Sequence, residues 1–225
     1  MNVDFTGILA QVFLLAPPIL LALTVHEASH GLVAWWRGDP TARLAGRLTL
    51  NPLRHLDPVG TLVFFISAMA GAGFGWAKPV PVNLANLRNP RRDVIWVSAA
   101  GPAANILAAI VLALLLNSLL SLGAAREEHW WLPLLHMLNL GVQVNVVLAC
   151  FNLIPLPPLD GSGILSGFLP PRAAARYQSL GRYGFFILLA LLFLPRMIPG
   201  LPDPIHFLVV YPATTLIDLL LPWWR

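Results

Sequence analysis

Charged residues are scarce in this sequence. Only 11% of its 225 residues are charged, whereas 57% are hydrophobic. A soluble domain typically contains about 25% charged residues, so this chain has too few charges to cover a water-exposed surface. The composition therefore excludes a soluble globular domain and a disordered chain. The net charge of +4 is too small to indicate a polyanion-binding surface, and we expect no nucleic-acid partner.

Cysteine and lysine are almost absent. Cys150 is the single cysteine and lies within an apolar run, which excludes a disulfide-stabilised fold and a zinc site built from cysteines. One lysine stands against thirteen arginines. Together with the many alanines, this ratio suggests a GC-rich bacterial genome.

Long apolar runs are what the sequence does contain. About 20 consecutive apolar residues suffice for a helix to cross a bilayer. The candidate spans, of which the last two are shorter and contain prolines, are Phe5–Val25, Val94–Leu122, Leu132–Ile154, Tyr183–Met197 and Ile205–Leu221. The helical pattern of the first span continues to Trp36. The stretch Gly60–Phe74 is short and glycine-rich, so we expect a re-entrant segment there.

These runs predict an all-α polytopic membrane protein with five to six transmembrane helices. We expect a single domain over residues 1–225, with a core over about 5–165 and C-terminal helices over about 180–222. If Gly60–Phe74 is re-entrant, twelve of the fourteen basic residues fall on one side of the bilayer, and only Arg126 and Arg196 fall on the other. By the positive-inside rule that side is cytoplasmic, which predicts a multi-pass protein of the cell membrane.

Tryptophans support this arrangement. An amphipathic indole ring is typical of the headgroup layer at the end of a membrane helix. Seven of the eight tryptophans fall at predicted helix ends: Trp35, Trp36, Trp96, Trp130, Trp131, Trp223 and Trp224.

The end of the first apolar run contains His26-Glu27-Ala28-Ser29-His30, an HExxH motif. Positions i and i+4 lie on one face of an α-helix, so both imidazoles can bind one metal ion. Glu27 lies beside them, placed to take a proton from a water molecule that zinc activates. Ionisable residues near the middle of a membrane helix cost roughly 2.5–3.5 kcal/mol each and usually serve function, which argues against a role in capping alone.

A catalytic zinc site usually has three protein ligands, so the motif leaves one to be found. The candidates are Asp57 and Asp160. Prolines at 155, 157 and 158 interrupt the helix before Asp160, and Gly161 allows a tight turn that would direct the carboxylate toward the metal. Both the motif and Asp160 are predicted on the inner side of the bilayer. We therefore expect Asp160 to be the third ligand and Asp57 to cap the turn that follows it.

The pairing of HExxH in a membrane helix with the later stretch Asn152-Leu-Ile-Pro-Leu-Pro-Pro-Leu-Asp160-Gly161 resembles the site-2 protease family of intramembrane zinc metalloproteases. The likeness is to small bacterial members without a PDZ or cystathionine-synthase-like domain. The segments 100–105 (AGPAAN) and 75–83 (GWAKPVPVN) are similar to that family as well. The resemblance covers roughly residues 20–165.

This resemblance implies a zinc endopeptidase that cleaves a peptide bond in or near a transmembrane segment of a membrane protein substrate. It implies that His26, His30 and Asp160 bind one zinc ion and that Glu27 activates water. Asn152 would stabilise the developing oxyanion or hold substrate, or else serve only in helix packing. Both interpretations of Asn152 stay open.

A strand pattern lies between these motifs. Leu44, Gly46, Leu48 and Leu50 alternate with period two, and Val80 and Val82 lie between prolines. By resemblance, these segments form a membrane-associated β-hairpin beside the active site. Its free edge would pair with an unwound substrate segment, or it would only cover the re-entrant segment.

Two functions of other classes fit parts of the same pattern. A catalytically inactive zinc-binding pseudoprotease would keep the metal site and bind membrane partners without cutting them. A metal-ion transporter would also place histidine and aspartate in the membrane, but its ligands would follow a path rather than form one cluster. The intact set of Glu27 and three predicted ligands favours the protease.

Overall fold

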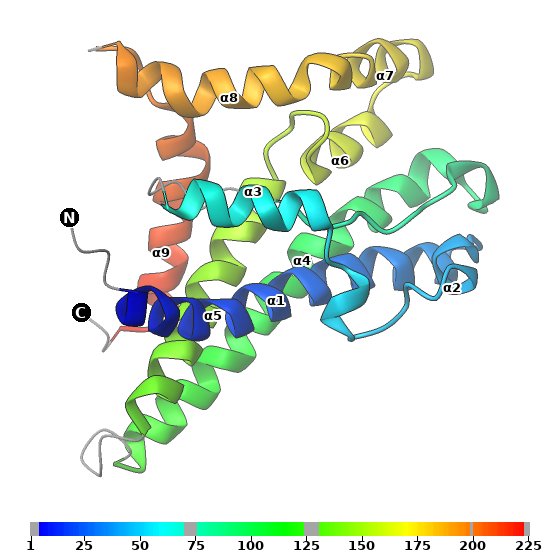
Figure 1. Ribbon diagram of the computed structural model, residues 1–225. Coiled ribbons are helices and arrows are strands. Elements are labelled where there is room, and N and C mark those ends of the chain that lie inside the picture. Colours follow the sequence, from blue (N-terminus) through cyan, green and yellow to red (C-terminus); the bar gives the residue numbers. More distant parts are fainter. Residues whose placement is uncertain (1–4, 70–75, 124–130, 199, 223–225) are drawn as a thin grey trace.

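The computed structural model describes residues 5–69, 76–123, 131–198 and 200–222, and consists of helices joined by turns (Figure 1). Trp130, Trp223 and Trp224, predicted at helix ends, lie outside the described residues. In chain order the elements are α1 (Phe5–Trp36), α2 (Thr41–Leu44), η1 (Pro52–Arg54), α3 (Pro58–Met69), η2 (Leu84–Asn86), α4 (Pro90–Ser121), α5 (Leu132–Asn152), α6 (Asp160–Phe168), α7 (Pro171–Gln178), α8 (Gly181–Met197), η4 (His206–Val210) and α9 (Tyr211–Leu220).

Three of these helices are long and apolar enough to cross a membrane: Val12–Trp36 within α1, α4 and α5. At 1.5 Å per residue, even the 21 residues of α5 reach about 30 Å, the thickness of the hydrocarbon core. The three long runs are thus confirmed as helices, and they pack against one another.

The largest buried cluster lies where α4, α5 and α9 meet. Leu116 of α4 and Leu135, Val142 and Val146 of α5 are fully buried there, next to Ala213 of α9. Outward-facing positions of α4 are also large and apolar, among them Leu107 and Leu114. A helix that is apolar on its outer face as well belongs in lipid rather than in water.

The predicted β-hairpin is wrong, since the described residues contain no strand. Residues Thr41–Leu44 form the helical turn α2, and Gly46 has a φ of +65° that ends it. Leu44 is 82% exposed and Leu50 73% exposed, so the alternating residues bury no common face. The segment around Val80 and Val82 supplies no partner strand, because Pro79 and Pro81 have no N–H to donate to a β-ladder. An isolated bridge between Leu56 and Ala77 is the β-pairing observed.

The predicted re-entrant segment begins as α3. Its 12 residues reach about 18 Å, which is too short to cross the bilayer; residues 70–75 lie outside the described residues.

Near the C-terminus, α7 and α8 form a pair bent by 58° that counts at most as one span, and the helix His206–Leu220 is shorter than a typical span. The described residues thus contain three candidate spans, or four with the bent pair.

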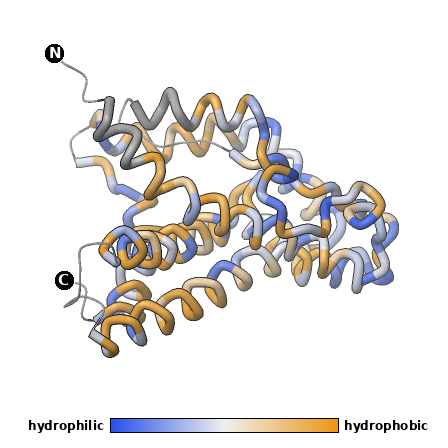
Figure 2. The backbone as a smooth tube through the Cα atoms, turned by 60° about the horizontal axis from the view of Figure 1, so that its bottom comes forward, coloured by the Kyte–Doolittle hydropathy of each residue, from blue (hydrophilic) through white to orange (hydrophobic). Residues whose placement is uncertain are grey.

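Polar residues gather mainly at one end of the molecule, where α1 ends, α4 begins and α2 and α7 lie (Figures 1 and 2). The segment between Arg37 and Arg92 at this end contains most of the basic residues of the chain. The opposite end, where α4 and α9 end, is mostly hydrophobic (Figure 2). This asymmetry fits a membrane protein with one strongly basic face.

Candidate metal and catalytic site

The structure brings His26, His30 and Asp160 together. The Nε2 atoms of the two histidines are 3.1 Å apart, and the Oδ2 atom of Asp160 lies 3.0 Å from that of His26 and 3.3 Å from that of His30. One ligand atom from each residue falls within 4.8 Å of the others. The two histidines of the HExxH motif on α1 and the first residue of α6 therefore meet at one place.

Hydrogen bonds on the far side of each ring determine which nitrogen faces this point. His26 Nδ1 lies 2.6 Å from Oδ1 of Asn105, and His30 Nδ1 lies 2.7 Å from the carbonyl oxygen of Val97. A carbonyl only accepts, so each Nδ1 must be the protonated donor. In the neutral rings, both Nε2 atoms then present lone pairs toward Asp160.

The orientation of the Asn105 amide is itself determined by its neighbours. Asn105 is fully buried, and its Nδ2 donates to the carbonyl of Ala22 in α1 and to Oδ1 of Asn145 in α5. The oxygen of the amide must therefore face His26. Asn105 thus forms hydrogen bonds across helices, and its acceptor end holds a candidate metal ligand.

These residues fit a metal ion. Two imidazole lone pairs and a carboxylate oxygen converge without a proton donor between them, and the buried Oδ2 of Asp160 has no hydrogen-bond partner among the described residues. Three acceptors in one buried place repel one another unless a cation lies between them. Two histidines and one carboxylate are a ligand set typical of catalytic zinc.

Close helix approaches make room for this cluster. A Cβ atom on Gly101 would lie 2.5 Å from His30 Nε2 and 2.7 Å from His26 Nε2, so α4 can face the imidazoles only with glycine there. A Cβ atom on Gly161 would lie 2.2 Å from the carbonyl oxygen of Leu153. Glycine at 161 therefore lets α6 begin directly against the end of α5, which places Asp160 beside α1.

Glu27 is held by a segment that the sequence analysis did not connect to it. Its Oε2 accepts a hydrogen bond of 2.8 Å from the backbone N–H of Val80. The surrounding segment is fixed in turn, because Lys78 N–H donates to the carbonyl of His55 and the guanidinium of Arg47 donates to the carbonyl of Lys78. We call residues 77–83 the strap. The donor is a backbone N–H, which a motif of side-chain types does not reveal. The sequence pointed to this segment only through the similarity of residues 75–83 to a known family.

The other predicted site residues lie in simpler surroundings. Asp57 accepts a hydrogen bond from the N–H of Gly60, 2.7 Å away, and so caps α3 as expected. Asn152 donates from Nδ2 to the carbonyl of Leu148 in its own helix, at 3.0 Å. No hydrogen bond among the described residues joins Asn152 to the cluster of His26, His30 and Asp160.

A groove of about 470 Å³ leads from the surface to Asp160. It runs between α4, α6 and α7, and small residues line much of it, among them Ser98, Ser162, Gly163 and Gly167. The groove gives a small or extended molecule a route to Asp160.

Peptidase family M50 matches residues 117–194. "Putative zinc metalloprotease YwhC" of Bacillus subtilis is 40% identical over 177 residues, which cover 79% of this chain and 78% of that protein. "Putative zinc metalloprotease Rip2" of Mycolicibacterium smegmatis is 31% identical over 182 residues, which cover 79% of this chain and 66% of that protein. No solved structure matches the chain.

Proposed function

Because this chain belongs to peptidase family M50, the site-2 protease family, we propose that it hydrolyses a peptide bond in or near a transmembrane segment of another membrane protein. Family membership makes it a zinc metalloprotease, and its apolar helices make it a membrane protein. The proposal adds the intramembrane substrate, the residues that act and the single zinc ion.

The convergence of His26, His30 and Asp160 is the observation that carries the proposal. These three residues would hold one zinc ion, because one ligand atom from each lies within 4.8 Å of the other two. Zinc bound there would supply Lewis acidity, which lowers the pKa of a water molecule to about 7 and polarises a carbonyl. Asn105 and Val97 hold the two imidazoles in the tautomer that ligation needs.

Glu27 would act as the general base. It lies between the two ligating histidines in the chain and is only partly buried, so water can reach it. The N–H of Val80 occupies Oε2, and within the described residues Oε1 remains available to take a proton from the attacking water. The same carboxyl group would then give the proton to the leaving amine. Asn152 would support the oxyanion only after its amide turns away from Leu148.

The depth of the cluster supports an intramembrane reaction. His30 and His26 lie six and ten residues before Trp36, where the candidate span ends. At 1.5 Å per residue this puts them about 9 Å and 15 Å below that end. The groove beside Asp160 would admit water, or an extended stretch of substrate, to this depth.

The same proposal includes a topology. We propose one domain over residues 1–225, in which α8 and the helix His206–Leu220 complete five crossings and Gly60–Phe74 is re-entrant. The basic end of the molecule would face the cytoplasm of a bacterial cell, because arginines gather there and the relatives are bacterial. The site would then open toward the cytoplasmic side.

The deciding experiment compares purified wild type with Glu27→Gln in zinc content and in cleavage of a fluorescent transmembrane reporter. We expect one zinc per chain in both proteins and cleavage by wild type alone. A matched carboxylate variant, Asp57→Asn, should keep both zinc and activity, because an asparagine also caps α3.

Three results would overturn parts of the proposal. Full activity of Glu27→Gln would remove the general base, and absence of zinc from wild type would remove the metal site. Zinc in both proteins, with no cleavage of any transmembrane reporter by wild type, would establish a zinc-binding pseudoprotease instead.

A further inference from the structure

A second cavity, of about 640 Å³, lies where α1 ends and α4 begins. Its walls include Trp36, Arg37, Arg88, Arg92 and Trp96. Neither Glu27 nor any of the three predicted metal ligands lines it, so it is separate from the candidate site. The residues that form it come from the end of α1 and from the start of α4, on either side of the segment that connects these two helices.

Positive charge dominates this cavity. The guanidinium of Arg37 lies 3.4 Å from the Oδ1 of Asp93 and 5.4 Å from the centre of the Trp96 ring. Asp93 is buried, and its other oxygen accepts from the N–H of Asn89. Within the described residues, Arg37–Asp93 is the ion pair of this cavity. Three arginines and one aspartate therefore line the cavity.

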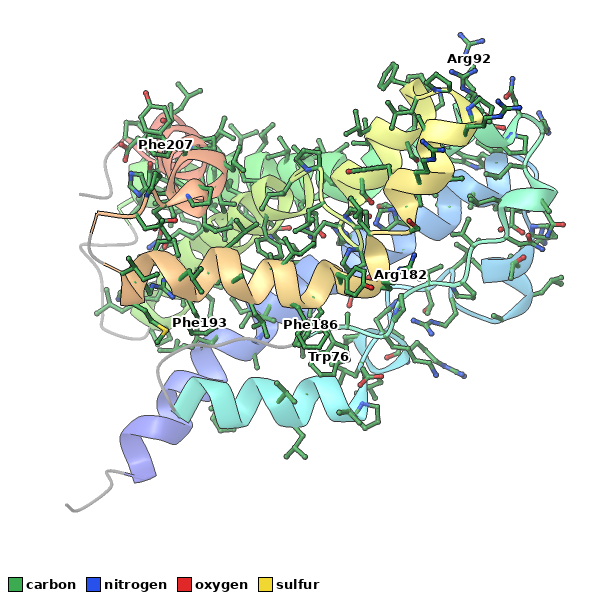
Figure 3. All side chains as sticks on the ribbon, turned by 90° about the horizontal axis from the view of Figure 1, so that it is seen from above. Trp76, Arg92, Arg182, Phe186, Phe193 and Phe207 are labelled. Atoms are coloured by element: carbon green, nitrogen blue, oxygen red, sulfur yellow. The ribbon has the colours of Figure 1, made fainter. Side chains whose placement is uncertain are left out.

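The backbone holds these arginines together. The N–H of Arg88 donates to the carbonyl of Arg37 at 3.0 Å, which joins the end of α1 to the approach to α4. Arg92 follows in the first turn of α4 and projects outward from this end of the molecule (Figure 3). Three arginines that line one cavity suit a phosphate, which takes paired N–H donors from guanidinium groups.

The cavity lies at the depth of lipid headgroups. The candidate spans end at Trp36 and begin at Pro90, so both helices leave the hydrocarbon beside it. Trp36 is 61% exposed and Trp96 53% exposed, as is typical of indole rings at a membrane interface. We propose that this cavity binds the phosphate of an anionic phospholipid, with Arg37, Arg88 and Arg92 as its ligands and the acyl chains along the apolar faces of α1 and α4.

A basic cavity between membrane helices is a recognised form of headgroup site. A free phosphate ion would use the same guanidinium groups, but it would gain nothing from the apolar helix faces below them. The lipid is therefore the ligand to which the proposal commits. The proposal does not depend on the protease activity.

The test titrates the purified full chain in detergent with phosphatidylglycerol and counts bound lipids by native mass spectrometry. We expect the double variant Arg88→Gln/Arg92→Gln to bind phosphatidylglycerol about tenfold or more weakly than wild type. A matched control, Arg172→Gln/Arg176→Gln, removes the same charge from α7 and should bind as wild type does. Arg37 is left in place because its loss would leave the buried carboxylate of Asp93 without its ion-pair partner.

A second pair of measurements keeps the proposal falsifiable. Arg88→Lys/Arg92→Lys retains the charge and the fold but loses paired donors, and its affinity should fall between wild type and the glutamine variant. Phosphatidylcholine and inorganic phosphate should each bind more weakly than phosphatidylglycerol. Equal binding by the glutamine variant and its α7 control would overturn the site, and displacement of the lipid by inorganic phosphate at equal concentration would replace the lipid with a free phosphate ligand.

Discussion

The Nδ1 atom of His26 donates to the Oδ1 of Asn105, 2.6 Å away, across the contact between α1 and α4. This bond determines which nitrogen of His26 faces Asp160. Since the Nδ2 of Asn105 also reaches α5 through Asn145, one amide joins all three long helices at the candidate metal site.

Asn105→Ala should weaken zinc binding without removing any metal ligand. The freed ring of His26 can then turn or change its tautomer, and loss of such a supporting hydrogen bond typically costs 10–100-fold in metal affinity. Competition with a zinc chelator measures the change. The control is Asn117→Ala, which breaks a bond between α4 and Leu220 far along the helix. Equal zinc affinity in both variants would contradict the role given to Asn105.

Gly101→Ala should disturb the cluster by crowding it. The added methyl group would lie 2.5–2.7 Å from the imidazole atoms of His26 and His30, so the rings or α4 must shift. We expect a loss of zinc and of cleavage that exceeds any loss of thermal stability. Gly141→Ala is the comparison, because there the methyl group meets only the end of the Leu112 side chain, at 2.9 Å. A Gly101→Ala protein with normal zinc content and activity would show that the helices separate at little cost.

Val80→Pro should reduce catalysis while leaving zinc bound. Proline lacks the N–H that holds Oε2 of Glu27, so the carboxylate loses its fixed position. Val80→Ala keeps that N–H and removes only buried side-chain volume. We expect kcat to fall by about tenfold or more in the proline variant, as for a misplaced catalytic group, and to stay near the wild-type value in the alanine variant. Similar activity of the two variants would mean that Glu27 needs no support from the strap.

Acid should destabilise the protein partly through Asp39. Burial by itself would raise the pKa of Asp39, but hydrogen bonds from Thr41, Asn86 and the N–H of Asn83 hold that pKa below its ordinary value of 3.8. Because the folded state has the lower pKa, the stabilisation is fully present above pH 3.8 and disappears as the pH falls through the folded value.

Thermal unfolding of wild type and of Asp39→Asn measures this contribution. The scans run from about pH 6 to about pH 3, a range that includes the ordinary pKa of an aspartate. The difference between their midpoints should shrink as the pH falls. A difference that stays constant over the whole range would contradict the assignment to Asp39.

The parts of the site that follow from local chain geometry were predictable. His26 and His30 share a helix face by their spacing, and the prolines before Asp160 end α5 at Asn152, where a helix break was expected. The bond between Asn105 and His26 was not predictable, because it depends on how α4 is rotated against α1. That rotation arises from packing along the whole interface rather than from any short motif.

The strap shows a different limit. An alternating pattern at 44–50 predicted a strand, but alternation specifies a strand only where a partner accepts its hydrogen bonds. Pro79 and Pro81 withhold donors, and the N–H of Val80 is used by Glu27. The backbone that would have formed a hairpin serves the candidate base instead, which no count of side-chain types reveals.

The donors of the proposed zinc site come from distant parts of the chain. His26 and His30 are separated from Asp160 by more than half of the sequence, including α3, α4 and α5. An ion shared by these residues closes one large covalent loop, much as a disulfide would, and restricts the unfolded chain accordingly. Zinc would then be a structural crosslink as well as a catalytic ion. Its removal should loosen the hold of Asp160 and α6 on α1, while the packing of α6 against α4 remains.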